Sequence, residues 1–143
     1  MTMTNLKRYE GVAIPYVCEL SGFWEHIDIE KEGMDMFWVG RGVGEFKVDV
    51  MKEGFHPADQ EGIVGRLREQ LAGRSEVGEP LAAGKWTRFQ TEQRSQEGYL
   101  SNFYAVRVTS SGLCIATVAF PSEEVDHFRV EIEAALGSID FPE

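Results

Sequence analysis

Polar and apolar side chains alternate with a period of two in several short segments, and no other pattern in the chain restricts the fold as strongly. In residues 45–50, Phe46, Val48 and Val50 are apolar and the residues between them are charged. Successive side chains of a strand point to opposite faces, so this alternation is typical of a half-buried strand. We expect strands over residues 9–14, 25–30, 34–39, 45–50, 85–94, 99–109 and 113–120.

Short turn signals between these segments indicate antiparallel neighbours. Ser110, Ser111 and Gly112 are typical of a tight hairpin. Residues 113–120 are almost wholly apolar, which predicts a central strand covered on both faces. Residues 74–84 contain Gly78, Pro80 and Gly84 and predict a loop. In the other strands one face is charged, and we expect these faces to form one broad, water-facing side with the helices behind it.

A mid-chain segment repeats apolar residues every four positions and predicts a helix. Pro57 suits its first position, and Ile63, Leu67 and Leu71 form the apolar stripe. We expect Gly73 to end this helix in a left-handed conformation.

A second helix is predicted near the C-terminus, with Ser122 as its N-cap and Gly137 at its end. Its buried face comprises Val125, Phe128, Ile132 and Ala135, and Ile139 and Phe141 are expected to return to the sheet. A chain of 143 residues fits one domain. The elements predict a single α+β domain over residues 1–143: an antiparallel sheet of about six strands with the two helices packed on it.

The charge balance limits the choice of partners. The chain has 24 Asp and Glu against 14 Lys and Arg, a formal net charge of −10. Proteins that bind nucleic acids concentrate Lys and Arg, because neutralising phosphates supplies most of their affinity. Nucleic acid and anionic membrane are therefore unexpected partners. The charge either keeps the protein soluble or steers it toward a basic protein partner, and both interpretations stay open.

The compartment is expected to be reducing. Two cysteines do not make a disulfide framework, and residues 1–10 are polar and lack the apolar core of a signal peptide. No apolar stretch approaches the roughly 18–20 residues needed to cross a bilayer. The sequence thus predicts a soluble, cytoplasmic protein.

Three segments resemble the PsbP-like superfamily, an αβα sandwich shared by the photosystem II extrinsic subunit, the Ran-binding Mog proteins and many uncharacterised bacterial domains. Residues 44–48 (GEFKV) are similar to a glycine-containing strand of the bacterial members. Residues 99–121 are similar to their strand pair that leads into the last helix, and residues 136–141 (LGSIDF) to their C-terminal ending. The resemblance favours the bacterial branch, implies a fold whose better-known members bind macromolecules, and carries over no catalytic residue.

No motif predicts a catalytic, metal or cofactor site. His26, Asp28 and Glu30 share one strand face. Three potential ligands on one face suit a metal site, but polar residues on one face are equally typical of any solvent-exposed strand. Cys114 lies in the most apolar segment and is expected to be buried and inert, and Cys18 borders an acidic residue. The sequence contains no nucleophile elbow, phosphate-binding glycine loop or zinc-type cysteine pair. We therefore expect no catalytic residue, no metal and no cofactor.

The charged face of the sheet and its tryptophans are the candidate binding surface. Trp38 and Trp86 alternate with Phe37 and Phe89, so each tryptophan points to the face opposite its phenylalanine. A tryptophan on the wetter face would anchor an interface. The candidate partner-binding residues are Trp38, Lys47, Trp86, Arg88 and Glu92.

These observations predict a non-catalytic interaction module, such as an accessory, chaperone or immunity protein for a protein partner. Because exposed edge strands can pair, it is expected as a monomer or a homodimer. The alternative is a small-molecule-binding protein, or an enzyme, that uses a pocket between the sheet and the mid-chain helix.

Overall fold

The computed structural model describes residues 7–10, 17–20, 24–27, 33–39, 43–51, 55–96 and 98–141. Within these ranges an eight-stranded antiparallel sheet has the order β3-β4-β5-β10-β9-β8-β6, with β7 also paired to β8. Its strands are β3 (Glu25–Ile27), β4 (Met34–Val39), β5 (Gly44–Met51), β6 (Glu76–Val77), β7 (Leu81–Ala83), β8 (Trp86–Ser95), β9 (Gly98–Thr109) and β10 (Gly112–Pro121). A separate two-stranded sheet pairs β1 (Lys7–Glu10) with β2 (Val17–Leu20).

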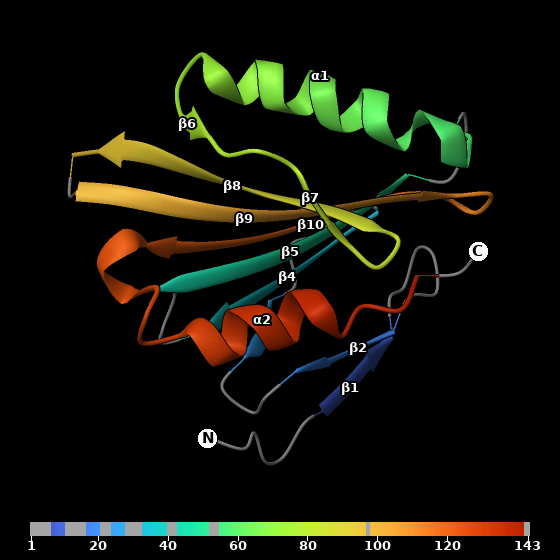
Figure 1. Ribbon diagram of the computed structural model, residues 1–143. Coiled ribbons are helices and arrows are strands. Elements are labelled where there is room, and N and C mark those ends of the chain that lie inside the picture. The colour runs from blue at the N-terminus through green and yellow to red at the C-terminus, as the bar shows by residue number, and fades with distance from the viewer. Residues whose placement is uncertain are drawn as a thin grey trace.

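Two helices lie on opposite faces of the large sheet, which makes three layers (Figure 1). Helix α1 (Gln60–Ala72) follows a 3-10 turn, η1 (Pro57–Asp59), and packs against β6, β8 and β9. Helix α2 (Arg129–Gly137) follows a second 3-10 turn, η2 (Ser122–Glu124), and packs against β10 and β2. The α+β class, the antiparallel sheet and both helices are confirmed. The expectation that both helices lie behind a single face is wrong.

The sheet has eight described strands rather than about six, because the predicted loop over residues 74–84 contains two of them. Strand β6 has two residues and β7 has three, and both pair with β8. Segments this short do not display an alternation, so the sequence pattern does not reveal them. The predicted strands over residues 9–14 and 25–30 are described only to Glu10 and Ile27, and their remaining residues lie outside the described ranges.

The central hairpin is as predicted. Thr109 pairs with Gly112 across a two-residue turn, and Gly112 has a φ of 142°, which glycine tolerates and other residues avoid. Strand β10 lies between β5 and β9 and is the central strand, as its apolar composition predicts.

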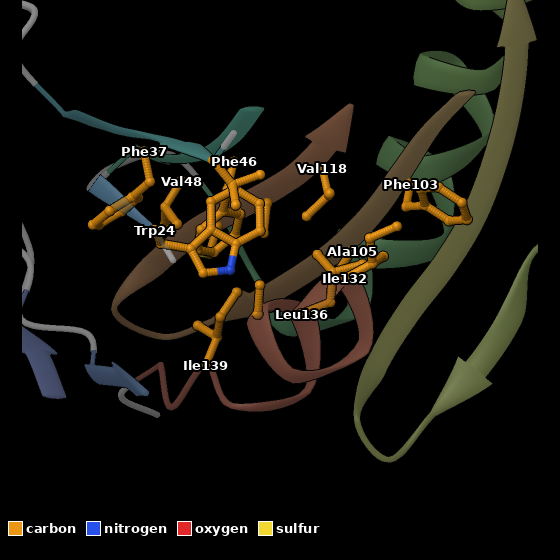
Figure 2. Close-up of a cluster of buried hydrophobic side chains, with 14 of the residues drawn as sticks. Trp24, Phe37, Phe46, Val48, Phe103, Ala105, Val118, Ile132, Leu136 and Ile139 are labelled. Carbon is orange, nitrogen blue, oxygen red and sulfur yellow. The ribbon is translucent and has the colours of Figure 1, made fainter. Parts of the chain in front are cut away.

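The larger core lies between the sheet and α2 (Figure 2). Alternate residues of β4, β5, β9 and β10 point into it, and Ile132 and Leu136 of α2 close it from below the sheet. The rings of Trp24 and Phe46 lie 5.9 Å apart in an edge-to-face arrangement. The tail contributes as predicted, since Ile139 and Phe141 are both buried in this cluster.

A smaller core lies between the sheet and α1. Val64 and Leu71 of the helix are buried against the other face of β8, β9 and β10, and Ile63 and Leu67 are partly buried beside them. The predicted apolar stripe of this helix is therefore confirmed. Because residues from both faces of β9 and β10 are buried, the middle of the sheet is covered on each side.

The helix ends differ from the prediction at two positions. Gly73 follows α1 with a φ of −67°, so its conformation is right-handed and not left-handed. Ser122 belongs to the 3-10 turn η2 instead of capping a helix, and its hydroxyl lies 2.7 Å from that of Ser101 on β9. The regular helix begins only at Arg129, although the predicted buried positions are buried or half-buried.

Candidate functional site

The strand register divides the five predicted surface residues between two faces of the sheet. Val118 on β10 pairs with Phe46 on β5 and with Phe103 on β9, so these three side chains share the α2 face. Lys47 and Trp38 alternate with residues of that face and therefore lie on the α1 face. On β8 the charged residues lie on the other face of the sheet. Arg88 is paired with Ala105, whose side chain belongs to the larger core on the α2 side. The structure thus brings Trp38 and Lys47 together, and Trp86, Arg88 and Glu92 together, on opposite sides.

Two of the residues on the α2 side, Arg88 and Trp86, have intramolecular contacts. The Arg88 guanidinium donates to the Glu133 carboxylate of α2 over 3.1 Å, which ties β8 to that helix. Trp86 is half-buried and packs against the larger core. Glu92 is directly opposite Glu76 on β6. These contacts give Arg88 and Trp86 structural roles.

The residues on the α1 side belong to a surface that we call the open strip: Met34, Met36 and Trp38 on β4, and Glu45, Lys47 and Asp49 on β5. Each methionine or tryptophan is directly opposite a charged residue of β5, Met36 opposite Lys47 and Trp38 opposite Glu45. Helix α1 packs against β6, β8 and β9, on the other half of the same face. The open strip is consequently the part of this face that lies beyond the helix (Figure 1).

Exposure distinguishes the open strip from the opposite side of the same strands. Phe37, Phe46 and Val48 point toward α2 and are buried, whereas Trp38 retains 40% of its surface. Met51, at the end of β5 on the same face, retains 45%. The Lys47 ammonium lies 3.1 Å from the Glu45 carboxylate, both partly in solvent. The open strip is therefore amphipathic, with apolar side chains along one strand and an ion pair along the next.

A cleft of about 870 Å³ lies between the first turns of α1 and the β7–β8 hairpin. Val64 of α1, Leu81 of β7 and Val108 of β9 supply apolar surface. Its charged lining comprises Glu61, Arg68, Lys85 and Arg107. Concave sites with apolar walls and a few polar groups are where proteins usually bind small molecules. This cleft lies between the sheet and the mid-chain helix, the place that the alternative prediction requires.

The Gln60 side chain, which lines this cleft, links the start of α1 to β8 and β9. Its side-chain amide donates to the Lys85 carbonyl and the Thr87 hydroxyl, each over 3.0 Å. Its side-chain oxygen accepts from the Val108 backbone amide over 2.8 Å. Strand β8 begins at Trp86 and pairs with β9 only as far as Val106, so Gln60 supplies the partner that β8 does not. The periodicity of α1 gave no signal for this role.

The described histidines have structural contacts. His26 lies 3.7 Å from Asp35 and packs on the Phe37 ring. His56 caps η1, because its Nδ1 accepts from the Ala58 backbone amide and its own amide donates to the Asp59 carboxylate. In the part of the chain that the structure describes, no three His, Cys, Asp or Glu side chains are grouped as metal ligands. Asp28 and Glu30, the predicted neighbours of His26, lie outside that part.

Two further groups lie away from the open strip, one buried and one half-buried. Cys114 is fully buried in the larger core, as predicted, and is a free thiol. Tyr104 stacks on Phe89 with ring centroids 4.7 Å apart, and burial raises the pKa of its hydroxyl. The side chain of Cys18 lies outside the description. Among the described helices, none is long and apolar enough to span a bilayer.

Comparison with solved structures defines the class of the fold. No protein-family model and no curated protein sequence matches the chain. The solution structure of cyanobacterial PsbP (CyanoP) from Synechocystis sp. PCC 6803 matches with a TM-score of 0.62 and 12% identity, over 96% of this chain and 93% of that one. A crystal structure from Bacteroides thetaiotaomicron VPI-5482 matches with a TM-score of 0.68 and 11% identity, over 98% of this chain.

The chain spans 50% of the length of the Bacteroides protein, and nearly all of CyanoP. The molecule is thus an αβα sandwich built on an antiparallel sheet. Within that class its fold is PsbP-like, as the three sequence segments indicate. Identities of 11% and 12% establish the fold and do not extend to activity.

Proposed function

We propose that this chain is a non-catalytic protein-interaction domain and that a protein partner docks on the open strip. The observation that carries the proposal is the exposure of Trp38, which keeps 40% of its surface in contact with solvent. Tryptophan is enriched among the few residues that dominate interface energies, where it fills a pocket of the partner. The neighbouring Phe37 is buried in the core, so β4 contributes one aromatic residue to the core and exposes a second one, Trp38, to solvent.

The side chains around Trp38 support the same function. Met34 and Met36 lie on the same face of β4 and are only half-buried. Unbranched methionine side chains adapt to the shape of a partner, and they are common at binding surfaces for that reason. The Lys47–Glu45 ion pair provides a polar border beside this apolar row.

The charge of the chain defines the chemistry of the partner. At a net charge of −10 the protein attracts a basic protein and repels an acidic one. We therefore propose a partner with an apolar pocket surrounded by Lys or Arg. Accessory, chaperone and immunity proteins act by such binding without catalysis. The free thiol of Cys114 suits the reducing, cytoplasmic location that we also propose.

Capture by two matched variants tests this function. The wild-type chain, Trp38→Ser and Tyr99→Ser are immobilised and exposed to extract from the native host. Tyr99 is the control, because it is an exposed aromatic residue (53%) on a different strand end. We expect a protein that the wild type and Tyr99→Ser retain and Trp38→Ser loses. With the purified partner, loss of a dominant interface residue is expected to weaken Kd by about 30-fold or more.

Two results would contradict the proposal. Equal retention by Trp38→Ser, with its fold verified by circular dichroism, would exclude the open strip as the docking surface. Retention of only a second copy of this chain, lost in the same variant, would establish a homodimer in place of a different protein.

A further inference from the structure

All three methionines in the described ranges lie on one face of two neighbouring strands. Met34 and Met36 are on β4, and Met51 ends β5. The register pairs Met34 with Asp49 and Met36 with Lys47, on the α1 face of the sheet. Met51 follows Asp49 by two positions and therefore shares this face. We call Met34, Met36 and Met51 the methionine row.

The methionine row is continuous with Trp38. On β4, Met36 lies between Met34 and Trp38, and side chains two positions apart on a strand face are separated by about 7 Å. Met51 is diagonal to Met34 across the antiparallel pair, a separation of about 7–8 Å that long side chains can bridge. The thioethers thus extend the apolar surface of the open strip from Trp38 to the end of β5.

Solvent reaches the methionine row but not the thiol in the core. Met51 retains 45% of its surface, and Met34 and Met36 are half-buried. Cys114 is fully buried in the larger core. The buried apolar residues of the described ranges include no methionine. A dissolved oxidant therefore meets the thioethers of this surface before Cys114, and their oxidation leaves the core residues unchanged.

Peroxide oxidises a methionine thioether in a single two-electron step. A lone pair of the sulfur attacks one oxygen of hydrogen peroxide, the O–O bond breaks, and after a proton shift the products are a sulfoxide and water. The flexible apolar side chain becomes a polar one with a hydrogen-bond acceptor. In an interface, an acceptor that loses its water and finds no donor opposes binding.

We propose that the methionine row is a peroxide-sensitive modification site, and that oxidation of its three thioethers to sulfoxides makes the open strip polar and releases the protein partner. This regulation rests on the proposed function, because it acts on the same docking surface. A methionine sulfoxide reductase reverses it, since two thiols form a disulfide and the sulfoxide oxygen leaves as water.

Peptide mapping by mass spectrometry tests the modification without a partner. The folded chain is treated with hydrogen peroxide, and each methionine is scored for the addition of one oxygen atom, with the fold checked by circular dichroism. We expect Met51 to react fastest, Met34 and Met36 to follow, and Cys114 to remain a thiol. Unmodified Met34 and Met36 after complete oxidation of Met51 would overturn the proposal.

The captured partner tests the effect on docking. The matched control is the triple variant Met34→Leu, Met36→Leu and Met51→Leu, because leucine conserves volume and apolar character and has no sulfur. We expect peroxide to weaken the Kd of the wild type by about tenfold or more and the reductase to restore it. The triple variant is expected to bind equally well before and after peroxide.

The outcomes separate this inference from the proposed function. A partner that Trp38→Ser loses, but whose Kd is unchanged by full oxidation of the methionine row, would overturn the inference and leave the docking surface standing. Equal loss of binding in the oxidised triple variant would overturn it as well, because the sensitive residue would lie elsewhere.

Absence of any such partner would contradict the proposed function, and retention on a phenyl column then decides the inference. Earlier elution of the oxidised wild type, but not of the oxidised triple variant, would support a switch from an apolar to a polar surface. Unchanged elution of both would overturn it.

Discussion

The ring of Phe120 occupies the space that a side chain at Gly44 would need. A Cβ at Gly44 would lie 2.1 Å from Cζ of Phe120 and 2.7 Å from a methyl group of Val39. Phe120 is fully buried, between Trp24 at 6.1 Å and Phe128 at 4.9 Å, so its ring has little room to move. The glycine at the start of β5 is therefore a packing requirement of the larger core.

The substitution Gly44→Ala is expected to lower the free energy of unfolding by about 1–3 kcal/mol, the usual cost of overfilling a core. Chemical denaturation with urea measures it. Gly62→Ala is the control, because a Cβ there meets no atom within 4 Å and the helix gains about 0.5–1 kcal/mol from losing a glycine. Equal stabilities of Gly44→Ala and the wild type would show that Phe120 yields without cost.

Tyr104 makes the stability of the fold sensitive to alkaline pH. Burial raises the pKa of its hydroxyl, and this effect exceeds the opposing influence of Thr91 and Arg74. Above the ordinary tyrosine pKa of about 10, the unfolded chain loses this proton while the folded chain retains it. The contribution of Tyr104 is thus complete below pH 10 and falls as the pH rises through the folded-state pKa.

Urea unfolding between pH 8 and 11 tests this effect. We expect the stability of the wild type to fall more steeply above pH 10 than that of Tyr104→Phe, which retains the stacking on Phe89. Parallel pH profiles of the two proteins would exclude Tyr104 as the cause.

At the scale of elements, α1 is fastened to the sheet by one amide as well as by apolar packing. Gln60 connects the start of β8 to the Val108 backbone amide of β9, three hydrogen bonds in total. Without it, Val108 loses the acceptor for its amide at a position that has no pairing partner on β8. A buried donor without a partner costs about 1–3 kcal/mol.

The substitution Gln60→Ala is expected to lower the free energy of unfolding by that amount, about 1–3 kcal/mol, and to speed hydrogen exchange at the Val108 amide. Gln70→Ala is the control, an exposed glutamine of the same helix. Slow exchange at Val108 in Gln60→Ala would mean that another group takes over as acceptor.

The elements themselves were largely predictable, and their mutual alignment was not. Alternation along β5 and β8 assigns two faces to each strand, because the period of the side chains is fixed by the backbone. It does not say which face of β5 coincides with which face of β8. That depends on the register through β10 and β9, which places Lys47 and Arg88 on opposite sides. The candidate surface was therefore divided, while the strands that carry it were identified correctly.

The site residues that the sequence did not indicate are those that act across long separations. The amide of Gln60 contacts Val108, 48 positions along the chain, and no local pattern encodes such a pair. Exposure of Trp38 has a similar origin, because it depends on α1 packing toward β8 and β9 and leaving β4 beyond its reach. Which half of a sheet face a helix covers is determined by the tertiary packing and not by a local sequence pattern.

The whole molecule combines a net negative charge, which acts at long range, with a local apolar surface, and the two govern different steps of binding. A net charge of −10 acts on a basic partner at a distance and raises the association rate. Trp38 acts only after contact, so its loss shortens the lifetime of the complex. The two contributions are separable by kinetics.

Surface plasmon resonance with the captured partner measures both rate constants. Raising NaCl from about 50 to 500 mM is expected to lower the association rate about tenfold, because the Debye length shortens from about 14 to 4 Å. Lys47→Glu should raise that rate at low salt by adding negative charge to the open strip, whereas Trp38→Ser should mainly raise the dissociation rate. An association rate that is independent of salt would show that charge serves solubility and not steering, and that the partner is not basic.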